Sequence, residues 1–351
     1  MNKKVINMYF ATHKTCNLSC KYCYIPTPDR TSKKTDDEAV IASLKEFIKK
    51  VETENYTIGK FCLHGTEPSL LAPVSLACIV KLVNEHWERN NVKNLNVTIQ
   101  TNGVRFNYEY LNVLEKGLED RNKLRIGFSI DAPKACHDFF RDNSYDLVYT
   151  NYNYAMHRKF PVSILSVVTN KTMEHLAQFK SWINVQLQRK IKYGNPYNIK
   201  IKFASGEFQL SAEELEKFSY FLVENKLQET VQILNPGYCM RSGNECMWFE
   251  FDVEGNCYSC NKSYFNGGGF ANWKQESFDN IFEKRGKLFE GNFENPECKE
   301  CCWETVCNSG CPIDRHKDGT LAGKAHECTL IKTVYKQMEQ NGIYISDILY
   351  N

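Results

Sequence analysis

Between residues 5 and 205 the chain alternates short runs of β-branched and aromatic residues with longer segments whose apolar residues recur at helical spacing. The short runs predict strands and the longer segments predict helices. Such an alternation predicts right-handed βαβ units and a parallel sheet, so the fold class is α/β. The predicted strands span residues 5–13, 60–65, 95–103, 124–132, 162–170 and 197–205, and predicted helices span residues 36–52, 76–90, 107–119 and 174–188.

The pattern changes after residue 210. Ser211 and Glu214 form a capping box that predicts the start of a further helix. Residues 235–330 are rich in Cys, Gly and Asn, which is typical of a small domain held by metal more than by a hydrophobic core. A last helix is predicted near residues 326–341. We therefore divide the chain into a first α/β domain (1–210), a bridging helix (211–234), a cysteine-rich domain (235–330) and a C-terminal helix and tail (331–351).

Composition narrows the class of protein. The chain has 351 residues, 42% of them apolar, and a net charge of +2, so we expect neither nucleic acid nor a membrane surface as the main partner. No signal peptide and no apolar run of about 18 residues are evident, which predicts a cytoplasmic protein. In that compartment the 16 cysteines are expected to be metal ligands more than disulfides.

Three of these cysteines, Cys16, Cys20 and Cys23, directly follow the first predicted strand. Parallel sheets place their chemistry at the C-terminal ends of strands. Thiolates are the usual ligands of iron–sulfur clusters, and three of them leave one iron of a [4Fe–4S] cluster open to an outside ligand. The alternatives are three unrelated thiols, or a zinc loop that lacks one ligand.

The spacing Cys-x3-Cys-x2-Cys, with Tyr22 before the last cysteine, resembles the signature of the radical S-adenosylmethionine (radical SAM) family. The resemblance implies a partial (β/α)6 TIM-type barrel. It also implies that the open iron binds the amino and carboxylate groups of SAM, and that one electron cleaves SAM to methionine and a 5′-deoxyadenosyl radical.

Further segments at successive strand ends resemble motifs of the same family: "HGTEPSLL" from residue 64, "QTNG" from residue 100 and "SIDAPKACHDFFR" from residue 129. Thr66 and Ala132 stand where the family has glycine, and we expect both changes to be tolerated. By resemblance, Glu67 and the backbone of its turn hold the methionine ammonium, Ser129 binds the ribose, Arg141 binds the SAM carboxylate, and Tyr22 contacts the adenine through its backbone. The residues expected to bind SAM are therefore Tyr22, Gly65, Thr66, Glu67, Asn102, Ser129 and Arg141.

The C-terminal cysteines follow the pattern Cys-x2-Cys-x5-Cys-x3-Cys, which resembles the SPASM domain of radical SAM peptide-modifying enzymes. That resemblance implies two auxiliary [4Fe–4S] clusters, three in all with the SAM-binding cluster. The first would be held by Cys239, Cys246, Cys260 and Cys311, and the second by Cys298, Cys301, Cys307 and Cys328.

Alternatives remain for these cysteines. Taken alone, the tail also fits a zinc ribbon. Cys302 could replace Cys301 as a ligand, although the spacing favours Cys301. Cys62 and Cys78 are expected to be buried small apolar residues, and Cys136 and Cys257 fit no metal pattern.

Auxiliary clusters favour net two-electron oxidation of a peptide side chain, because the substrate radical can lose an electron to them. Sulfatase-maturing relatives carry an Asp base directly after the cysteine equivalent to Cys260, whereas Asn261 follows it here, which disfavours formylglycine formation. The better match is a maturase that cross-links a ribosomally made precursor peptide (RiPP), for example an aromatic ring to a Cβ atom in a cyclophane. A formylglycine-forming enzyme and a non-catalytic zinc scaffold remain the alternatives, and no catalytic base can be identified.

The expected partners follow from this chemistry. They are a precursor peptide and an external one-electron reductant such as flavodoxin or ferredoxin. The chain begins only one strand ahead of the first cysteine cluster. We therefore expect the leader of the peptide to be recognised by a separate protein or by the edges of the barrel and the SPASM domain.

Overall fold

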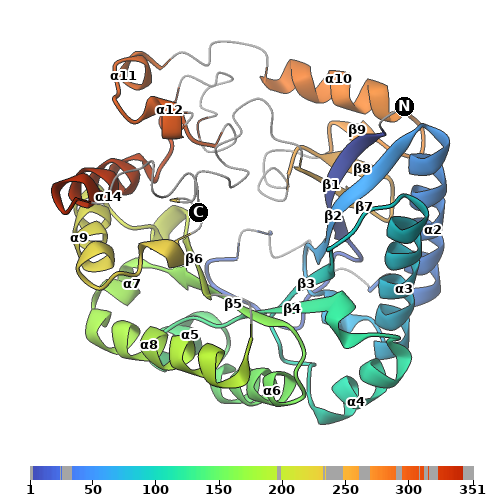
Figure 1. The fold of residues 1–351 in the computed structure, drawn as a ribbon, viewed down its shortest axis with the longest axis horizontal. Coiled ribbons are helices and arrows are strands. Elements are labelled where there is room, and N and C mark those ends of the chain that lie inside the picture. The colour runs from blue at the N-terminus through green and yellow to red at the C-terminus, as the bar shows by residue number, and fades with distance from the viewer. Residues whose placement is uncertain are drawn as a thin grey trace.

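The computed structural model describes residues 3–23, 25, 34–195, 199–231, 234, 248–260, 269–289, 295–307, 309–311, 315 and 323–342. Figure 1 shows a curved sheet with α-helices along its outer side and the cysteine-rich C-terminal part beside it. Within the described residues, no helix is both long and apolar enough to cross a membrane.

All six predicted strands are present and form one parallel sheet. Three later strands, which were not predicted, extend this sheet beyond its first strand in the order β6-β5-β4-β3-β2-β1-β7-β8-β9. β7 is parallel to β1, and β8 and β9 are antiparallel additions. The strands are β1 (Lys4–Ala11), β2 (Tyr56–His64), β3 (Val97–Thr101), β4 (Leu124–Ser129), β5 (Val162–Val168), β6 (Ile199–Phe203), β7 (Trp248–Asp252), β8 (Asn256–Tyr258) and β9 (Ala271–Asn272).

The four predicted helices of the first domain are confirmed, and further short helices lie between the later strands. Figure 1 shows α2, α3, α4, α6 and α8 along the outer side of the sheet. The helices of this part are α2 (Asp37–Thr53), α3 (Pro73–Arg89), α4 (Tyr108–Gly117), α5 (Lys134–Phe140), α6 (Tyr145–His157), α7 (Asn170–Met173) and α8 (Leu176–Tyr193). Single 3₁₀ turns occur at Pro68–Leu70, Arg121–Lys123, Gly206–Phe208 and Gln228–Thr230.

The C-terminal half contributes α9 (Ala212–Glu224), α10 (Phe278–Phe289), α11 (Pro296–Lys299), α12 (Glu304–Cys307) and α14 (Cys328–Gln340). The predicted capping box at the start of α9 is confirmed, because the Ser211 hydroxyl accepts from the Glu214 amide and the Glu214 carboxylate accepts from the Ser211 amide. The last predicted helix is confirmed as α14, which packs against α9. The domain boundary at residue 235 lies outside the described residues and stays a prediction.

The sheet has two unlike faces. On β1, Ile6, Met8 and Phe10 are fully buried on the helix side, where the Phe10 ring lies 6.5 Å from the ring of Phe47 in α2. Asn7 and Tyr9, which alternate with these residues, are only partly buried and face the concave side. The apolar core therefore lies between the sheet and its helices, and the concave face is left for polar side chains.

The apolar core continues into the C-terminal half. The Phe47 ring lies 4.8 Å from the Phe251 ring of β7 and 5.1 Å from the Trp273 ring. Both Phe251 and Trp273 are fully buried. The strands after residue 247 are thus packed on the same core as the barrel strands.

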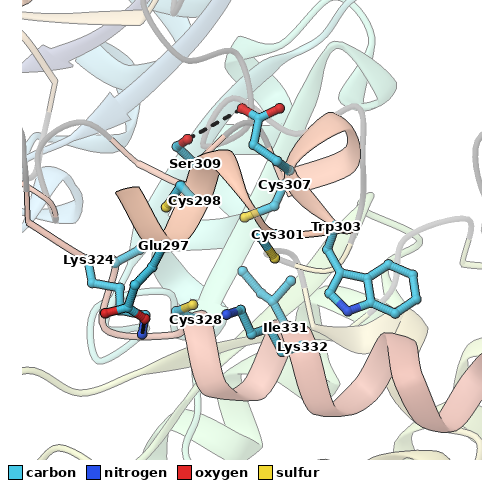
Figure 2. A pocket seen from close by; sticks show the side chains of 12 residues that line it. Glu297, Cys298, Cys301, Trp303, Cys307, Ser309, Lys324, Cys328, Ile331 and Lys332 are labelled. Carbon is cyan, nitrogen blue, oxygen red and sulfur yellow. Dashed lines mark hydrogen bonds and ion pairs between the residues drawn. The ribbon is translucent and has the colours of Figure 1, made fainter. Parts of the chain in front are cut away.

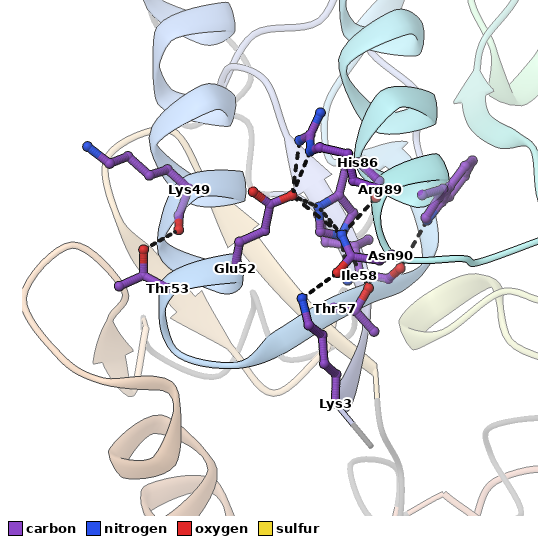
Figure 3. Close-up of polar contacts among 10 residues, drawn as sticks. Lys3, Lys49, Glu52, Thr53, Thr57, Ile58, His86, Arg89 and Asn90 are labelled. Carbon is purple, nitrogen blue, oxygen red and sulfur yellow. Dashed lines mark hydrogen bonds and ion pairs between the residues drawn. The ribbon is translucent and has the colours of Figure 1, made fainter. Parts of the chain in front are cut away.

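A buried histidine joins two of the outer helices to the sheet (Figure 3). His86 of α3 is fully buried, and its Nε2 accepts a hydrogen bond from the Ile58 amide at 3.0 Å. Its Nδ1 therefore carries the proton and donates to Glu52 Oε1 of α2 at 2.8 Å. Glu52 also accepts from Arg89 Nη2 at 3.0 Å. The neutral imidazole thus makes one hydrogen bond to the backbone of β2 and one to a side chain of α2.

We expect His86→Phe to destabilise the fold by about 1–3 kcal/mol, because the Ile58 amide becomes a buried donor without an acceptor. Burial lowers the pKa of His86, although Glu52 opposes this. Below a pH of about 6.5 the unfolded state then binds the proton more readily than the folded state, so stability falls as the pH drops.

Urea unfolding at several pH values tests this expectation. The difference in stability between the native protein and His86→Phe should shrink below pH 6.5. Glu52→Gln serves as the milder control, because its amide oxygen still accepts from Nδ1. A difference that does not change with pH would contradict the neutral state of His86.

Candidate functional site

The first three cysteines lie in the loop after β1, at the C-terminal edge of the sheet. The turn containing Gly65, Thr66 and Glu67 follows β2 at the same edge, Asn102 follows β3, and Ser129 ends β4. Arg141 follows α5 and reaches back to the same loop. The structure therefore brings the residues that the sequence pointed to together at one edge of the sheet.

The turn after β2 is tied to the loop after β1 by hydrogen bonds. The Thr66 hydroxyl donates to the His13 carbonyl at 2.6 Å, and the Glu67 amide donates to the Thr15 carbonyl at 3.3 Å. His13 Nε2 lies 2.7 Å from the Glu67 carbonyl. The side chain of Thr66, at the position where the similar motif has glycine, thus holds the cysteine loop against β2.

The backbone conformation at position 65 favours glycine. Its φ of +106° lies in the region that side chains disfavour, and a Cβ there would stand 3.0 Å from the Cβ of Ala11. The close approach of the turn to the end of β1 therefore depends on this glycine.

Glu67 links the ends of β2 and β3. Its side chain is 1% exposed, and Oε1 accepts from the Thr101 hydroxyl at 2.6 Å and from the Ser69 amide at 2.9 Å. Oε2 accepts from the Asn102 amide at 2.7 Å. Burial raises the pKa of Glu67, while these hydrogen bonds oppose the rise. The carboxyl group is thus held in one orientation by neighbours on both strands.

Asn102 joins the end of β3 to the cysteine loop. Its Nδ2 donates to Asn17 Oδ1 at 2.8 Å and lies 3.8 Å from the Cys16 sulfur. Its Oδ1 accepts from the Val104 amide at 3.0 Å, which fixes the amide orientation. Ser129 lies on the neighbouring strand, where its hydroxyl accepts from Gln100 Nε2 at 2.9 Å.

Asp131 is the centre of a buried network that the sequence analysis did not assign to the site. Its Oδ2 accepts from Arg141 Nε at 2.8 Å and from the Tyr22 hydroxyl, and its Oδ1 accepts from the Val167 amide at 2.9 Å. Arg141 Nη1 lies 3.9 Å from the Cys20 sulfur. Asp131 thus orients the side chains of two residues of the predicted site, Arg141 and Tyr22. The signal was present in the segment "SIDAP", where the acid sits two residues after Ser129.

The loop after β1 carries three thiols, the donor type that iron–sulfur clusters use. Burial raises the pKa of the Cys16 thiol to about 12, with a further contribution from Glu67, and a bound metal reverses this preference because it binds the thiolate. In the described part of the chain, no three His, Cys, Asp or Glu side chains are close enough to hold one metal ion. Thiolates that each bind a different iron of one cluster stand farther apart than the ligands of one ion.

Four cysteines of the C-terminal part line one pocket, and Figure 2 shows their sulfur atoms around the same space. They come from α11, α12, the turn between these helices, and the first residue of α14. The neighbouring Cys302 is exposed and does not line the pocket. The cysteines of the pocket are Cys298, Cys301, Cys307 and Cys328, the set expected for the second auxiliary cluster.

The ligands expected for the first auxiliary cluster are only partly described. Cys311 is buried and Cys260 is partly buried, and neither lines the pocket of the other four. Cys239, Cys246 and Asn261 lie outside the described residues. Cys257 is fully buried on β8, where its sulfur donates to the Gly255 carbonyl, so it belongs to the core.

The concave face carries charged residues that the sequence analysis missed. Glu250 of β7 is 1% exposed, and no hydrogen bond is made to its Oε2. Burial, with a smaller contribution from Asp252, raises the pKa of Glu250 to about 8. Lys200 on β6 also faces this side, and burial lowers its pKa to about 8. Both groups can exchange a proton near neutral pH, which is unusual for their types.

The comparisons with known proteins agree with this arrangement. The chain is 26% identical, over 84% of its length and 85% of the relative, to the cysteine-type anaerobic sulfatase-maturating enzyme of Clostridium perfringens. The structure of native anSMEcpe with bound AdoMet and Kp18Cys peptide superposes with a TM-score of 0.75 at 19% identity, covering 98% of this chain and 99% of that one.

A second solved structure, Streptococcus suis SuiB bound to precursor peptide SuiA, superposes with a TM-score of 0.63 at 12% identity, covering 93% of this chain and 76% of that one. At these identities the structural likeness shows the fold, which is the predicted α/β fold with a parallel-sheet core. Residues 11–183 match the description of the Radical SAM superfamily. This match spans the cysteine loop and the strand ends around it and covers just under half of the chain, so this segment is similar to a radical SAM domain.

Proposed function

We propose that the chain is a radical SAM peptide maturase that oxidatively cross-links side chains of a ribosomally made precursor peptide. The observation that carries this proposal is the pair of cysteine sites: three cysteines at the C-terminal edge of the sheet, and a separate pocket lined by four more. A single SAM-binding cluster needs only the first site. The second supports an enzyme that also removes an electron from its substrate.

In this proposal Cys16, Cys20 and Cys23 hold the SAM-binding cluster. When bound, SAM and this cluster supply a carbon radical that abstracts a hydrogen atom from the substrate. The backbone of the turn at Gly65, with Glu67 locked behind it, orients the methionine end of SAM. The remaining expected contacts are Tyr22, Thr66, Asn102, Ser129 and Arg141, which lie around the same loop.

The auxiliary ligands are proposed as two sets. The four cysteines of the pocket in Figure 2 hold the second auxiliary cluster. Cys260 and Cys311, together with the undescribed Cys239 and Cys246, hold the first. An external one-electron reductant such as flavodoxin or ferredoxin reduces the SAM-binding cluster.

A formylglycine-forming activity is the second candidate, because the relative reported above is a sulfatase-maturating enzyme that aligns with most of the chain. Asn261, in the position after Cys260, argues against it, since an amide cannot take up the proton that formylglycine formation releases. Both activities would use the same cofactors, so the cofactors do not distinguish between the two candidates.

One experiment separates these candidates. The chain is purified without oxygen, reconstituted, and incubated with SAM and dithionite together with the short peptides encoded next to its gene. A cross-link removes two hydrogen atoms and creates no aldehyde, whereas formylglycine is an aldehyde that reacts with a hydrazide reagent. Formation of 5′-deoxyadenosine with a cross-linked peptide supports the proposal. A hydrazide-reactive peptide supports the second candidate, and absence of 5′-deoxyadenosine with zinc in place of iron rejects both.

The two adjacent cysteines give a matched pair of variants. We expect Cys301→Ser to lower the iron content by about four atoms per chain, from about twelve, because one ligand of a four-iron cluster is lost. Cys302→Ser should leave the iron content unchanged, because its thiol is exposed outside the pocket. Iron and sulfide analysis after anaerobic reconstitution measures both. Full iron in both variants would mean that either thiol can serve, and equal losses would mean that both thiols are needed.

A further inference from the structure

A buried arginine stands beside the four-cysteine pocket. Arg315 is 1% exposed, and its amide donates to the Cys311 carbonyl at 3.2 Å. Its own carbonyl accepts from the Gly323 amide at 3.1 Å, and a Cβ on Gly323 would stand 2.3 Å from that oxygen. Arginine is almost never buried this deeply unless negative charge surrounds it. The backbone around Arg315 is therefore held in place by hydrogen bonds and close packing. Its buried guanidinium needs negative charge nearby.

Among the described residues, thiols are the main acidic neighbours of Arg315. Its electrostatic neighbours are Cys298 and Cys307 of the pocket, Cys311, and the carboxylate of Glu304. Burial by itself lowers the pKa of Arg315, and a metal binds cysteine as the negatively charged thiolate. A four-iron cluster bound by four thiolates is a net anion, so the site becomes electrostatically balanced when such a cluster is in place.

The other cations at the pocket differ from Arg315 in their contact with water. Lys324 lines the pocket, but its side chain is 42% exposed and paired with Glu297. Lys332 is partly exposed on α14. Water and salt screen the fields of exposed charges, whereas a charge in the protein interior keeps most of its effect. Of these three cations, Arg315 is the most shielded from water, so its charge is the least screened.

We propose that Arg315 sets the reduction potential of the second auxiliary cluster by holding a buried positive charge beside two of its ligands. This rests on the proposed function, because it requires that Cys298, Cys301, Cys307 and Cys328 hold a cluster. Reduction adds one electron to a group that is already anionic. A nearby fixed cation stabilises the reduced form more than the oxidised form, and so raises the potential. The pocket thereby becomes a better acceptor for the single electron that a substrate radical loses.

The test uses the reconstituted holoenzyme and needs no peptide. The second auxiliary cluster is assigned as the electron paramagnetic resonance signal that is absent from Cys328→Ser. Its potential is then measured by redox titration in the native protein, in Arg315→Gln and in Arg315→Lys. At a fixed applied potential, Arg315→Gln should lower the ratio of reduced to oxidised cluster about tenfold, which is about 59 mV for a one-electron couple. Arg315→Lys should recover most of this change, because it keeps the charge.

Two further variants control for screening and for loss of the cluster. Lys324→Gln should change the ratio less than about threefold, because its charge is exposed. Glu304 lines the pocket, so Glu304→Gln removes a negative charge next to the cluster and should shift the ratio the other way. If Arg315→Gln loses iron, Arg315→Lys decides, because it keeps the charge and should keep both the iron and most of the potential. Full iron with an unchanged potential in Arg315→Gln overturns the proposal, and so does an Arg315→Lys variant that keeps its iron but shifts the potential as far as Arg315→Gln. If the native protein lacks the Cys328-dependent signal, the pocket holds no second auxiliary cluster, and the proposed role of Arg315 is rejected with it.

Discussion

Replacing Asp131 with alanine is expected to destabilise the fold by about 3–5 kcal/mol, because it leaves a buried guanidinium without its counter-ion. Arg141 is 7% exposed and Asp131 is 1% exposed, so water cannot take the place of the carboxylate. The Tyr22 hydroxyl and the Val167 amide lose their acceptor in the same variant. Because Arg141 and Tyr22 both belong to the predicted SAM site, binding of SAM should weaken together with the stability.

Asp146→Ala is the matched control for this variant. Asp146 also forms an ion pair, with Lys134 at 2.8 Å, but its side chain is 81% exposed. An exposed pair of this kind contributes about 0–1 kcal/mol. Urea unfolding of both variants measures the difference. A double variant, Asp131→Ala with Arg141→Met, should recover part of the loss because it removes the unpaired charge. If Asp131→Ala costs no more than Asp146→Ala, the buried pair does not stabilise the site.

Local pattern was enough to predict the strands and helices that repeat the βα unit. It failed for α6, where Tyr145, Asn151 and Tyr152 occupy buried positions and so blur the apolar periodicity. It also failed for β7, because the strand that pairs with it, β1, lies more than 230 residues earlier in the chain. A pairing over that separation leaves no trace in the periodicity of either segment.

Residues of the candidate site could be predicted where they come directly after a predicted strand. Gly65, Glu67 and Asn102 stand at the ends of β2 and β3, and register alone brings them together. Glu250 and Lys200 could not be assigned in this way, because which face of a strand becomes concave is settled only when the whole sheet curves. Asp131 was passed over because its role depends on Arg141, ten residues later, folding back onto it.

The largest expected effect on activity is that of Cys16→Ala. Cys16 lies at the point where the cysteine loop meets β3, with its sulfur 3.8 Å from Asn102 Nδ2. In the proposed function its thiolate binds one iron of the cluster that delivers the electron to SAM. Since the cofactor supplies the difficult step, loss of this ligand should lower formation of 5′-deoxyadenosine at least about 1,000-fold. The iron content should fall by about four atoms per chain.

Cys78→Ala is the control, because Cys78 lies on α3 away from the cysteine loop and fits no metal pattern. It should keep the iron content and SAM cleavage of the native protein. Mass spectrometry of 5′-deoxyadenosine, with an unfolding curve for each variant, separates loss of the cluster from loss of the fold. Continued SAM cleavage by Cys16→Ala would contradict the assignment of this loop. A folded variant that keeps its auxiliary iron but cleaves no SAM would instead show that the two cysteine sites load independently, as expected from their separate places in the fold.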